Sequence, residues 1–267
     1  SPEIVNPTEA PFDFKGKIRF ENVSYRFPNS GIQAIENLSF EIQPGETLAV
    51  LGRTGSGKST IIHLLLRQFD PDEGQIYIDE QPLNQINLEA FRNQTGVVPQ
   101  EVFLFSDSIE NNVKFGLAEK QEAARKDVEN ALIKAHVYHN VTNFKNGLDT
   151  VLGERGVNIS GGQKQRIGIA RAIATNPKLI IADEPVSALD LSVQAQVLNF
   201  LKDIQDELGL SYLFISHDLG VVKHMCDHIS IMYKGRFVES GSKKDIYQNP
   251  QHIYTKRLLS AIPTIEP

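Results

Sequence analysis

Hydrophobic and polar residues alternate with a period of two in several segments, the pattern of strands that bury one face. Segments with this alternation, including a hairpin pattern around Lys234-Gly235, cover residues 17–25, 34–42, 74–83 and 228–241. Short apolar runs without alternation are typical of fully buried strands, and they lie at residues 47–51, 179–183 and 212–216.

Helical spacing of apolar residues begins at Lys58 and recurs through most of residues 106–175, most clearly in the segment EAARKDVENALIKAHV. An amphipathic segment at 192–209 separates two of the apolar runs, and such a strand–helix–strand unit favours a parallel sheet. The sequence therefore predicts an α/β fold with a mainly parallel sheet, an N-terminal antiparallel β subdomain and a helical insertion.

The chain begins with SPEIVNPTEAPFDFKG, which is rich in proline and turn formers. We expect residues 1–16 to be a linker and residues 17–267 to be one domain. Within it we expect a helical subdomain at about 106–175 and a C-terminal extension at about 242–267. The start at Ser1 and the lack of a signal-peptide pattern suggest a chain cut or processed from something longer.

Composition narrows the classes of function. The 267 residues are 40% hydrophobic and carry a formal net charge of −6, which counts against a nucleic-acid partner. The single cysteine, Cys226, excludes an internal disulfide and fits a reducing compartment, and its more ordinary interpretation is a small buried apolar residue. No apolar run is long enough to span a membrane.

A glycine-rich segment, GRTGSGKST, follows the first apolar run. It fits the phosphate-loop pattern G-x-x-x-x-G-K-[ST] between a strand and a helix. Its glycines let backbone N–H groups surround a phosphate chain, and the helix start adds a favourable dipole. Lys58 would supply charge to the β- and γ-phosphates and Ser59 a hydroxyl ligand for Mg²⁺. The alternative is a glycine-rich turn with a chance lysine.

Polar residues also follow the other two apolar runs, and ligands bind at such strand ends in open α/β sheets. Asp183 could hold Mg²⁺, and Glu184 could act as a base toward an attacking water. His217 could sense the γ-phosphate, and Gln100, in GVVPQEVFLF, could reach Mg²⁺ or water. Solvated acids, a structural histidine and a surface glutamine are the alternatives.

The segment NISGGQKQR raises the possibility of a second anion-facing structure. Ser160 and Gln163 have the spacing of a capping box, so a helix should begin here with its positive dipole end facing outward. Gly161 and Gly162 would let a backbone or a phosphate approach closely. The alternative is an ordinary capped helix.

Together these motifs resemble the nucleotide-binding domain of ATP-binding cassette (ABC) proteins, over nearly the whole chain. GRTGSGKST resembles the Walker A loop, LIIADE the Walker B strand, VVPQ the Q-loop, ISGGQ the signature, SALD the D-loop and SHD the H-loop. Ile159 stands where leucine is commoner. The resemblance implies a P-loop NTPase core of the ABC ATPase type.

The resemblance also implies that two copies pair head to tail, with each ATP lying between one Walker A loop and the other copy's signature. Glu184 would be the general base, with His217 and Gln100 as further catalytic residues. Mg²⁺ would be held through Ser59, Gln100 and Asp183, and Asp190 would bridge the copies. The nucleotide-binding residues would be Gly52, Arg53, Thr54, Gly55, Ser56, Gly57, Lys58, Ser59, Thr60, Ser160, Gly161, Gly162 and Gln163.

The segment NVSYRFPN fits the family's aromatic loop that stacks on adenine, with Phe27 where tyrosine is usual. Stacking needs only the face of a ring, so phenylalanine should serve. Tyr25 is the rival. Core packing is the alternative for both rings, and for Tyr25 it is the stronger interpretation.

Different parts of the chain resemble different ABC subfamilies. Up to about residue 165 the motifs resemble exporter-type domains, and from about 167 they resemble the ATPases of oligopeptide and dipeptide importers. We hypothesise a recombinant or engineered chimera; one divergent natural sequence is the alternative.

The resemblance implies Mg²⁺-dependent hydrolysis of ATP to ADP and phosphate, coupled to transport by membrane subunits, on the cytoplasmic face of a membrane. The segment at 100–115 would meet the membrane part. The alternatives are a soluble ABC ATPase without a transport role and a folded nucleotide-binding module with little activity.

Overall fold

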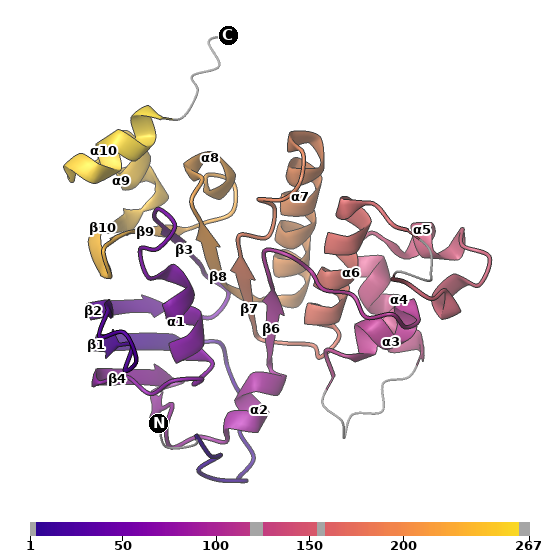
Figure 1. The fold of residues 1–267 in the computed structure, drawn as a ribbon, viewed down its shortest axis with the longest axis horizontal. Helices are drawn as coiled ribbons and strands as arrows, with labels where there is room; N and C mark the ends of the chain where they lie inside the picture. Colours follow the sequence, from indigo (N-terminus) through magenta and orange to yellow (C-terminus); the bar gives the residue numbers. More distant parts are fainter. Residues whose placement is uncertain (1–3, 118–124, 154–157, 262–267) are drawn as a thin grey trace. The chain divides into compact units, whose positions relative to one another are not determined.

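The computed structural model describes residues 4–117, 125–153 and 158–261 (Figure 1). The chain divides into two compact units, one made of residues 1–91 with 211–267 and the other of residues 92–210. Within the described residues, no helix is both long enough and apolar enough to cross a membrane.

The first unit contains the expected antiparallel sheet, in the strand order β2-β1-β4-β5. Its strands are β1 (Ile18–Arg26), β2 (Gln33–Ile42), β4 (Glu73–Ile78) and β5 (Gln81–Pro82). Ile18 and Phe20 of β1 and Ile76 and Ile78 of β4 are buried with the predicted period of two. In β1 the alternation ends after Glu21, where the register to β2 shifts and Val23, Ser24 and Tyr25 are all buried. The ring of Phe20 stacks on that of Phe40 across the β1–β2 pair, with centroids 4.4 Å apart.

One expected strand is divided. Residues 74–83 do not form a single strand, because Asp79 and Glu80 turn the chain with φ values of 46° and 65°. Such positive φ values occur in tight hairpin turns, where aspartate is among the residues that tolerate them. The result is the β4–β5 hairpin, closed by a 2.8 Å hydrogen bond from the Leu83 N–H to the Ile76 carbonyl.

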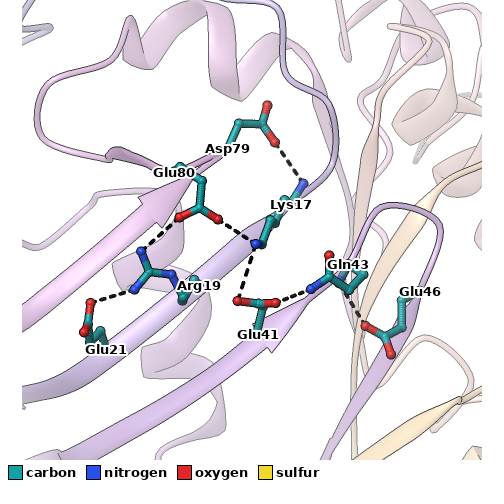
Figure 2. Close-up of polar contacts among 8 residues, drawn as sticks. All are labelled: Lys17, Arg19, Glu21, Glu41, Gln43, Glu46, Asp79 and Glu80. Atoms are coloured by element: carbon teal, nitrogen blue, oxygen red, sulfur yellow. Dashed lines mark hydrogen bonds and ion pairs between the residues drawn. The ribbon is translucent and has the colours of Figure 1, made fainter.

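Charged side chains form a network on this sheet (Figure 2). Lys17 contacts Glu41 and Glu80, and the other side of Glu80 accepts a hydrogen bond from Arg19. The hydrogen bond from Lys17, and to a lesser extent the one from Arg19, holds the pKa of Glu80 below its ordinary value. The Asp79 carboxylate accepts hydrogen bonds from the Lys17 and Lys15 N–H groups, so the network also fixes the entry into β1.

The second sheet segment of this unit has the order β10-β9-β3-β8. Its strands are β3 (Thr47–Leu51), β8 (Ser211–Ser216), β9 (His228–Tyr233) and β10 (Arg236–Ser242). Strands β3 and β8 are wholly buried and parallel, and Leu51 pairs with Ser216. The residues after these two strands therefore begin at the same edge of the sheet, as predicted. The β9–β10 turn is the expected Lys234-Gly235 pair, with φ values of 49° and 80°.

The helices of the first unit are α1 (Lys58–Leu65), α8 (Leu219–Val222), α9 (Lys243–Gln248) and α10 (Ile253–Ser260), with α2 (Leu88–Asn93) at its boundary. Within the expected linker, residues 4–16 form neither helix nor strand. Part of this segment is nevertheless packed, because Phe14 is fully buried. Its ring meets the ring of Phe91 edge-on, and the two ring centroids lie 5.2 Å apart.

The second unit holds the parallel pair β6 (Thr95–Val98) and β7 (Leu179–Asp183). Its helices are α3 (Ile109–Lys114), α4 (Arg125–Lys134), α5 (Tyr138–Thr142), η1 (Gly147–Asp149), α6 (Gly161–Ile173) and α7 (Leu191–Leu208). The start of the predicted helix at 122–137 lies outside the described residues. Helix α6 packs closely on β6, since a Cβ at Gly96 would lie 2.3 Å from the Ala172 carbonyl oxygen.

Candidate nucleotide site

The phosphate loop connects β3 to α1, as its sequence pattern predicts. Gly57 is the N-cap of α1 with φ 109°, and no side chain of the described residues caps this helix start. A Cβ on Gly57 would lie 2.5 Å from the Ala34 carbonyl oxygen, and one on Gly52 would lie 2.5 Å from the Met232 carbonyl oxygen. Glycine is therefore required at both positions, by close backbone approach and at Gly57 also by its dihedral angle.

Lys58 is folded over this loop. Its ammonium donates to the Gly52 carbonyl at 2.6 Å and to the Arg53 carbonyl at 3.0 Å, and the residue is only 6% exposed. The positive charge is therefore held inside the ring of backbone that would surround a phosphate. A buried ammonium favours an anion nearby, because its own solvation has been lost.

The hydroxyl of Ser56 gives an independent sign that the loop suits a polar ligand. Within the described parts of the chain this Oγ is buried and has no hydrogen-bond partner. Buried polar atoms are normally paired, and leaving one unpaired costs roughly 1–3 kcal/mol. The loop thus contains a polar atom that a bound phosphate or its water could satisfy. Ser59 and Thr54 are exposed, and Thr60 is buried in α1.

His217 lies directly after β8, in the same unit. It is exposed, and a turn holds its place in the chain: the Asp218 N–H donates to Ser216 Oγ at 3.0 Å. Asp218 then caps α8 by accepting from the Gly220 N–H at 2.7 Å. Since Leu51 and Ser216 are register partners, the H-loop and the phosphate loop start from neighbouring strand ends.

The two candidate adenine-stacking rings are placed differently. Tyr25 is only 4% exposed and stacks on Phe69, 5.2 Å between centroids. Burial is the main cause of its raised pKa, and it favours the core-packing interpretation. Phe27 is partly exposed and meets Tyr25 and Phe69 edge-on, so this ring has the better access to a base.

Asp183 ends β7 in the second unit and Glu184 follows it, and both are partly exposed. Glu184 has a left-handed backbone, φ 47°, which is uncommon for a residue with a side chain. Its carbonyl accepts from the Ser187 N–H at 3.2 Å and from Ser187 Oγ at 3.1 Å, and these bonds hold the turn. Strained backbone of this kind is often found at functional positions.

The Q-loop follows β6 and is packed against α6. Gln100 itself is exposed, while the preceding Pro99 carbonyl accepts from Gln165 Nε2 at 3.4 Å. A Cβ at Gly168 would lie 2.4 Å from a methyl carbon of Val102. The helix that carries the signature therefore directly supports the loop that carries Gln100.

The signature forms the capping box that its spacing predicts. Ser160 Oγ accepts from the Gln163 N–H at 3.2 Å, and Gln163 Oε1 accepts from the Ser160 N–H at 3.0 Å. The N–H groups of Ser160 and Gln163 are therefore already paired within the chain. A helix start leaves its first-turn N–H groups without intrahelical partners, so the amides of Gly161 and Gly162 are the ones that could meet an anion.

The two signature glycines also differ. A Cβ on Gly162 would lie 2.9 Å from Val193 Cγ1, whereas one on Gly161 would have an ordinary 3.6 Å contact with Leu189. Gly162 is thus needed for packing inside the chain, and close approach by a ligand is not its only possible reason. Asp190, in the D-loop, caps α7 by accepting from the Val193 N–H at 3.0 Å.

A model of the ABC transporter family matches residues 35–187, more than half of the chain. The chain belongs to the ABC transporter family. It is an ATPase domain of that family, which binds and hydrolyses ATP.

Relatives of this ABC ATPase include both subfamilies that its motifs resemble. It is 45% identical to the oligopeptide transport ATP-binding protein OppF of Lactococcus lactis subsp. lactis, over 88% of this chain and 74% of that protein. It is 37% identical to the probable multidrug resistance ABC transporter ATP-binding/permease protein YheI of Bacillus subtilis, over 92% of this chain and 41% of that protein. Each alignment covers most of the chain, so the comparisons do not support a chimeric junction near residue 165.

A solved structure confirms the predicted fold class. A bacterial Atm1-family ABC exporter with ATP bound superposes with a TM-score of 0.84 and 31% identity, over 97% of this chain and 44% of the exporter chain. The α/β architecture with an antiparallel β subdomain is therefore that of the ABC ATPase fold.

The donors predicted for Mg²⁺ fit that ion in their chemistry. Ser59, Gln100 and Asp183 all offer oxygen, which Mg²⁺ prefers, and it commonly keeps waters and phosphate oxygens as its other ligands. No cluster of three or more His, Cys, Asp or Glu side chains suited to a metal occurs in the described residues. A nucleotide-borne Mg²⁺ does not need such a cluster.

Some supporting residues were missed by the sequence interpretation. The Gly235 N–H donates to the Ser56 carbonyl at 2.8 Å, so the β9–β10 turn braces the phosphate loop from 179 positions away. Tyr254 Oη lies 3.4 Å from the Arg53 N–H, and Val193 fills the space beside Gly162. No local pattern marks such residues, because their roles depend on distant contacts.

Proposed function

We propose that two copies of this domain pair head to tail, hydrolyse ATP between them and energise peptide transport through membrane subunits. The observation that carries the ATP site is the phosphate loop, with its close-packed glycines, the buried Lys58 ammonium and a Ser56 hydroxyl that has no partner among the described residues. The peptide substrate rests on the relative OppF, which is named as an oligopeptide transport protein. We place the domain on the cytoplasmic face of a membrane.

In the proposed reaction, water attacks the γ-phosphorus, the bond from that phosphorus to the β–γ bridging oxygen breaks, and ADP leaves. Glu184 accepts the proton of the attacking water. Lys58 stabilises charge on the β- and γ-phosphates, and His217 donates to a γ-phosphate oxygen. Bound Mg²⁺ would neutralise phosphate charge, held by Ser59 and Asp183 with Gln100.

The partner copy would contribute its signature to each nucleotide. Gly161 and Gly162 present first-turn amides and the positive end of the α6 dipole, which together favour a phosphate. The Ser160 hydroxyl, while acting as the cap, can still donate its own proton to the γ-phosphate. We propose that Asp190 bridges the two copies.

A cluster of aromatic rings in the segment 100–115 supports a membrane-subunit partner. Phe103 and Phe115 are 67% and 63% exposed, and both approach the ring of Phe105, at centroid distances of 5.1 and 4.2 Å. Arg171 of α6 fixes the cluster, donating to the Phe103 carbonyl at 2.8 Å and to the Asn112 carbonyl at 2.8 Å. Exposed aromatic residues on a rigid support are typical of interface anchors.

Glu184→Gln is the deciding test of the proposed chemistry. The amide cannot accept the water's proton, so we expect phosphate release to fall about 10²-fold or more while ATP binding persists. Sizing of this variant should show a doubled mass with ATP and Mg²⁺ and the single mass without them. Equal phosphate-release rates for both proteins would remove Glu184 from its role, and a mass that never doubles would argue against the shared site.

The membrane partner is tested by the pair Phe103→Ala and Phe115→Ala. In the isolated domain we expect these variants to hydrolyse ATP at the wild-type rate, because neither ring is in the proposed nucleotide site. Reconstituted with the membrane subunits of a peptide importer, they should bind those subunits more weakly. Unchanged binding would exclude the cluster as the docking surface.

The chimeric origin remains a hypothesis from the sequence. Aligning residues 1–165 and 167–267 separately would decide it: if both halves find the same nearest relatives, the hypothesis fails.

A further inference from the structure

The C-terminal helices are tied to the sheet of the first unit. Figure 1 shows α9 and α10 in yellow next to β10, and α9 contacts both β9 and β10. The Glu239 carboxylate of β10 accepts from the N–H groups of Gln251 at 2.7 Å and His252 at 3.0 Å, which fixes the start of α10. Ser242 caps α9 by accepting from the Asp245 N–H at 3.2 Å.

Helix α10 reaches the start of the phosphate loop through one tyrosine. Tyr254 Oη accepts a hydrogen bond from the Arg53 N–H at 3.4 Å. The ring of Tyr254 packs on that of Tyr233, 4.7 Å between centroids. The residue before Tyr233, Met232, places its carbonyl against Gly52. The backbone at the beginning of the loop is therefore held by α10 and the β9–β10 hairpin together.

Helix α9 reaches the H-loop through another tyrosine. Tyr247 Oη donates to the carbonyl of Leu219, two residues after His217. The pKa of Tyr247 is raised, mainly because the phenol is buried, so the hydroxyl stays protonated and able to donate. Lys223 adds a weak contact at the other end of α8, with its ammonium 5.9 Å from the Tyr247 ring.

We propose that the C-terminal extension positions both nucleotide-handling loops of its own unit, with Tyr254 holding the Arg53 amide and Tyr247 holding the Leu219 carbonyl. The inference rests on the proposed function of these loops in ATP hydrolysis. Both tyrosines are positioning residues, since each acts on backbone beside the site. Tyr254 sets the phosphate loop and so mainly affects nucleotide binding, whereas Tyr247 sets His217 and so mainly affects turnover.

The test uses Tyr254→Phe and Tyr247→Phe in the full chain, because each removes one hydroxyl and keeps the ring. A neutral hydrogen bond corresponds to a change of about threefold to tenfold. We expect Tyr254→Phe to raise the KM for ATP by that factor with kcat nearly unchanged. Tyr247→Phe should lower kcat by that factor with KM nearly unchanged. Amide hydrogen exchange without nucleotide should become faster at residues 52–57 in the first variant and at 217–220 in the second.

Tyr77→Phe, on the antiparallel sheet, is the matched control. It should leave the KM, the kcat and the hydrogen exchange at residues 52–57 and 217–220 unchanged. Wild-type kinetics and exchange in both tyrosine variants would overturn the inference. The inference would also be overturned if both variants showed a lower kcat and a higher KM to the same extent, together with a lower unfolding midpoint. These changes would indicate general destabilisation. A wild-type chain that hydrolyses no ATP would refute the proposed function, and the exchange measurements would still decide the positioning role.

Discussion

The phosphate loop and the signature are both glycine-rich helix starts, but the chain completes them differently. Helix α1 begins at a left-handed Gly57 without a side-chain cap, and the Ser56 hydroxyl beside it has no partner within the described residues. Helix α6 begins with a full capping box from Ser160 and Gln163. An uncapped start leaves its donors to a ligand, whereas a capped start is stable alone. The comparison indicates that phosphate binding should order the first loop more than the second.

The largest effect is expected in the phosphate loop, from Gly57→Ala. The added Cβ would lie 2.5 Å from the Ala34 carbonyl oxygen, at a φ of 109° that disfavours a side chain. We expect loss of measurable ATP binding by calorimetry and a fall of about 3 kcal/mol in the free energy of unfolding.

Gly55→Ala is the matched control for this change, because its φ is 80° but no atom of the described residues lies within 4 Å of the added Cβ. Gly55→Ala should lower the free energy of unfolding by only about 1–2 kcal/mol, because it adds backbone strain alone. Equal stability of the two variants would show that the close approach at Gly57 is unimportant.

The next effect concerns packing within the signature. In Gly162→Ala the new methyl group would lie 2.9 Å from Val193 Cγ1, so we expect about 1–2 kcal/mol of destabilisation in urea unfolding. Gly161→Ala should change stability by less than about 0.5 kcal/mol.

A double-mutant cycle with Val193→Ala separates the two explanations of Gly162. If packing is the reason, the loss from Gly162→Ala should shrink in the Val193→Ala background. Strict additivity would assign Gly162 to ligand approach alone.

Removing the cap itself should have a smaller effect. Ser160→Ala deletes the acceptor for the Gln163 N–H, and N-cap deletions cost about 1 kcal/mol. Urea unfolding measures the loss, and Ser160→Asp, which restores an acceptor, should recover most of it. An unaltered midpoint for Ser160→Ala would mean that the capping box does not stabilise α6.

The smallest effect is a pH dependence at the cap of α7. The Asp190 carboxylate accepts a hydrogen bond from the Val193 N–H, which is the main cause of its lowered pKa. A hydrogen bond from the Ser192 side chain lowers this pKa further. A lowered folded-state pKa gives stability that is present above the ordinary value, about 3.8. This stability is lost as the pH falls through the folded-state pKa. In unfolding measured from pH 6 to pH 3, the stability difference between wild type and Asp190→Asn should therefore become smaller at the acidic end. A constant difference across this range would show that Asp190 does not titrate in this way.

The sequence determined most strand and helix positions, because hydrophobic periodicity acts over a few residues. The strands 47–51 and 179–183 are found with the expected bounds, as is the start of α1 at Lys58. The prediction of a single strand over residues 74–83 was wrong. The alternating pattern continues through Asp79 and Glu80, but their positive φ values turn the chain there. The motif order in the sequence also predicted the family, which the comparisons show.

Only the tertiary structure decided what surrounds those motifs. The sequence marks Gly162 as part of a signature, but Val193 beside it is 31 positions away in the chain. It offers Tyr25 and Phe27 as rival rings, and the burial of Tyr25 against Phe69 distinguishes them. Tyr254 lies 201 positions from Arg53, so no local pattern could have paired them. Periodicity and motif spacing are properties of neighbouring residues, whereas close packing and bracing hydrogen bonds arise when the folded chain brings distant segments together.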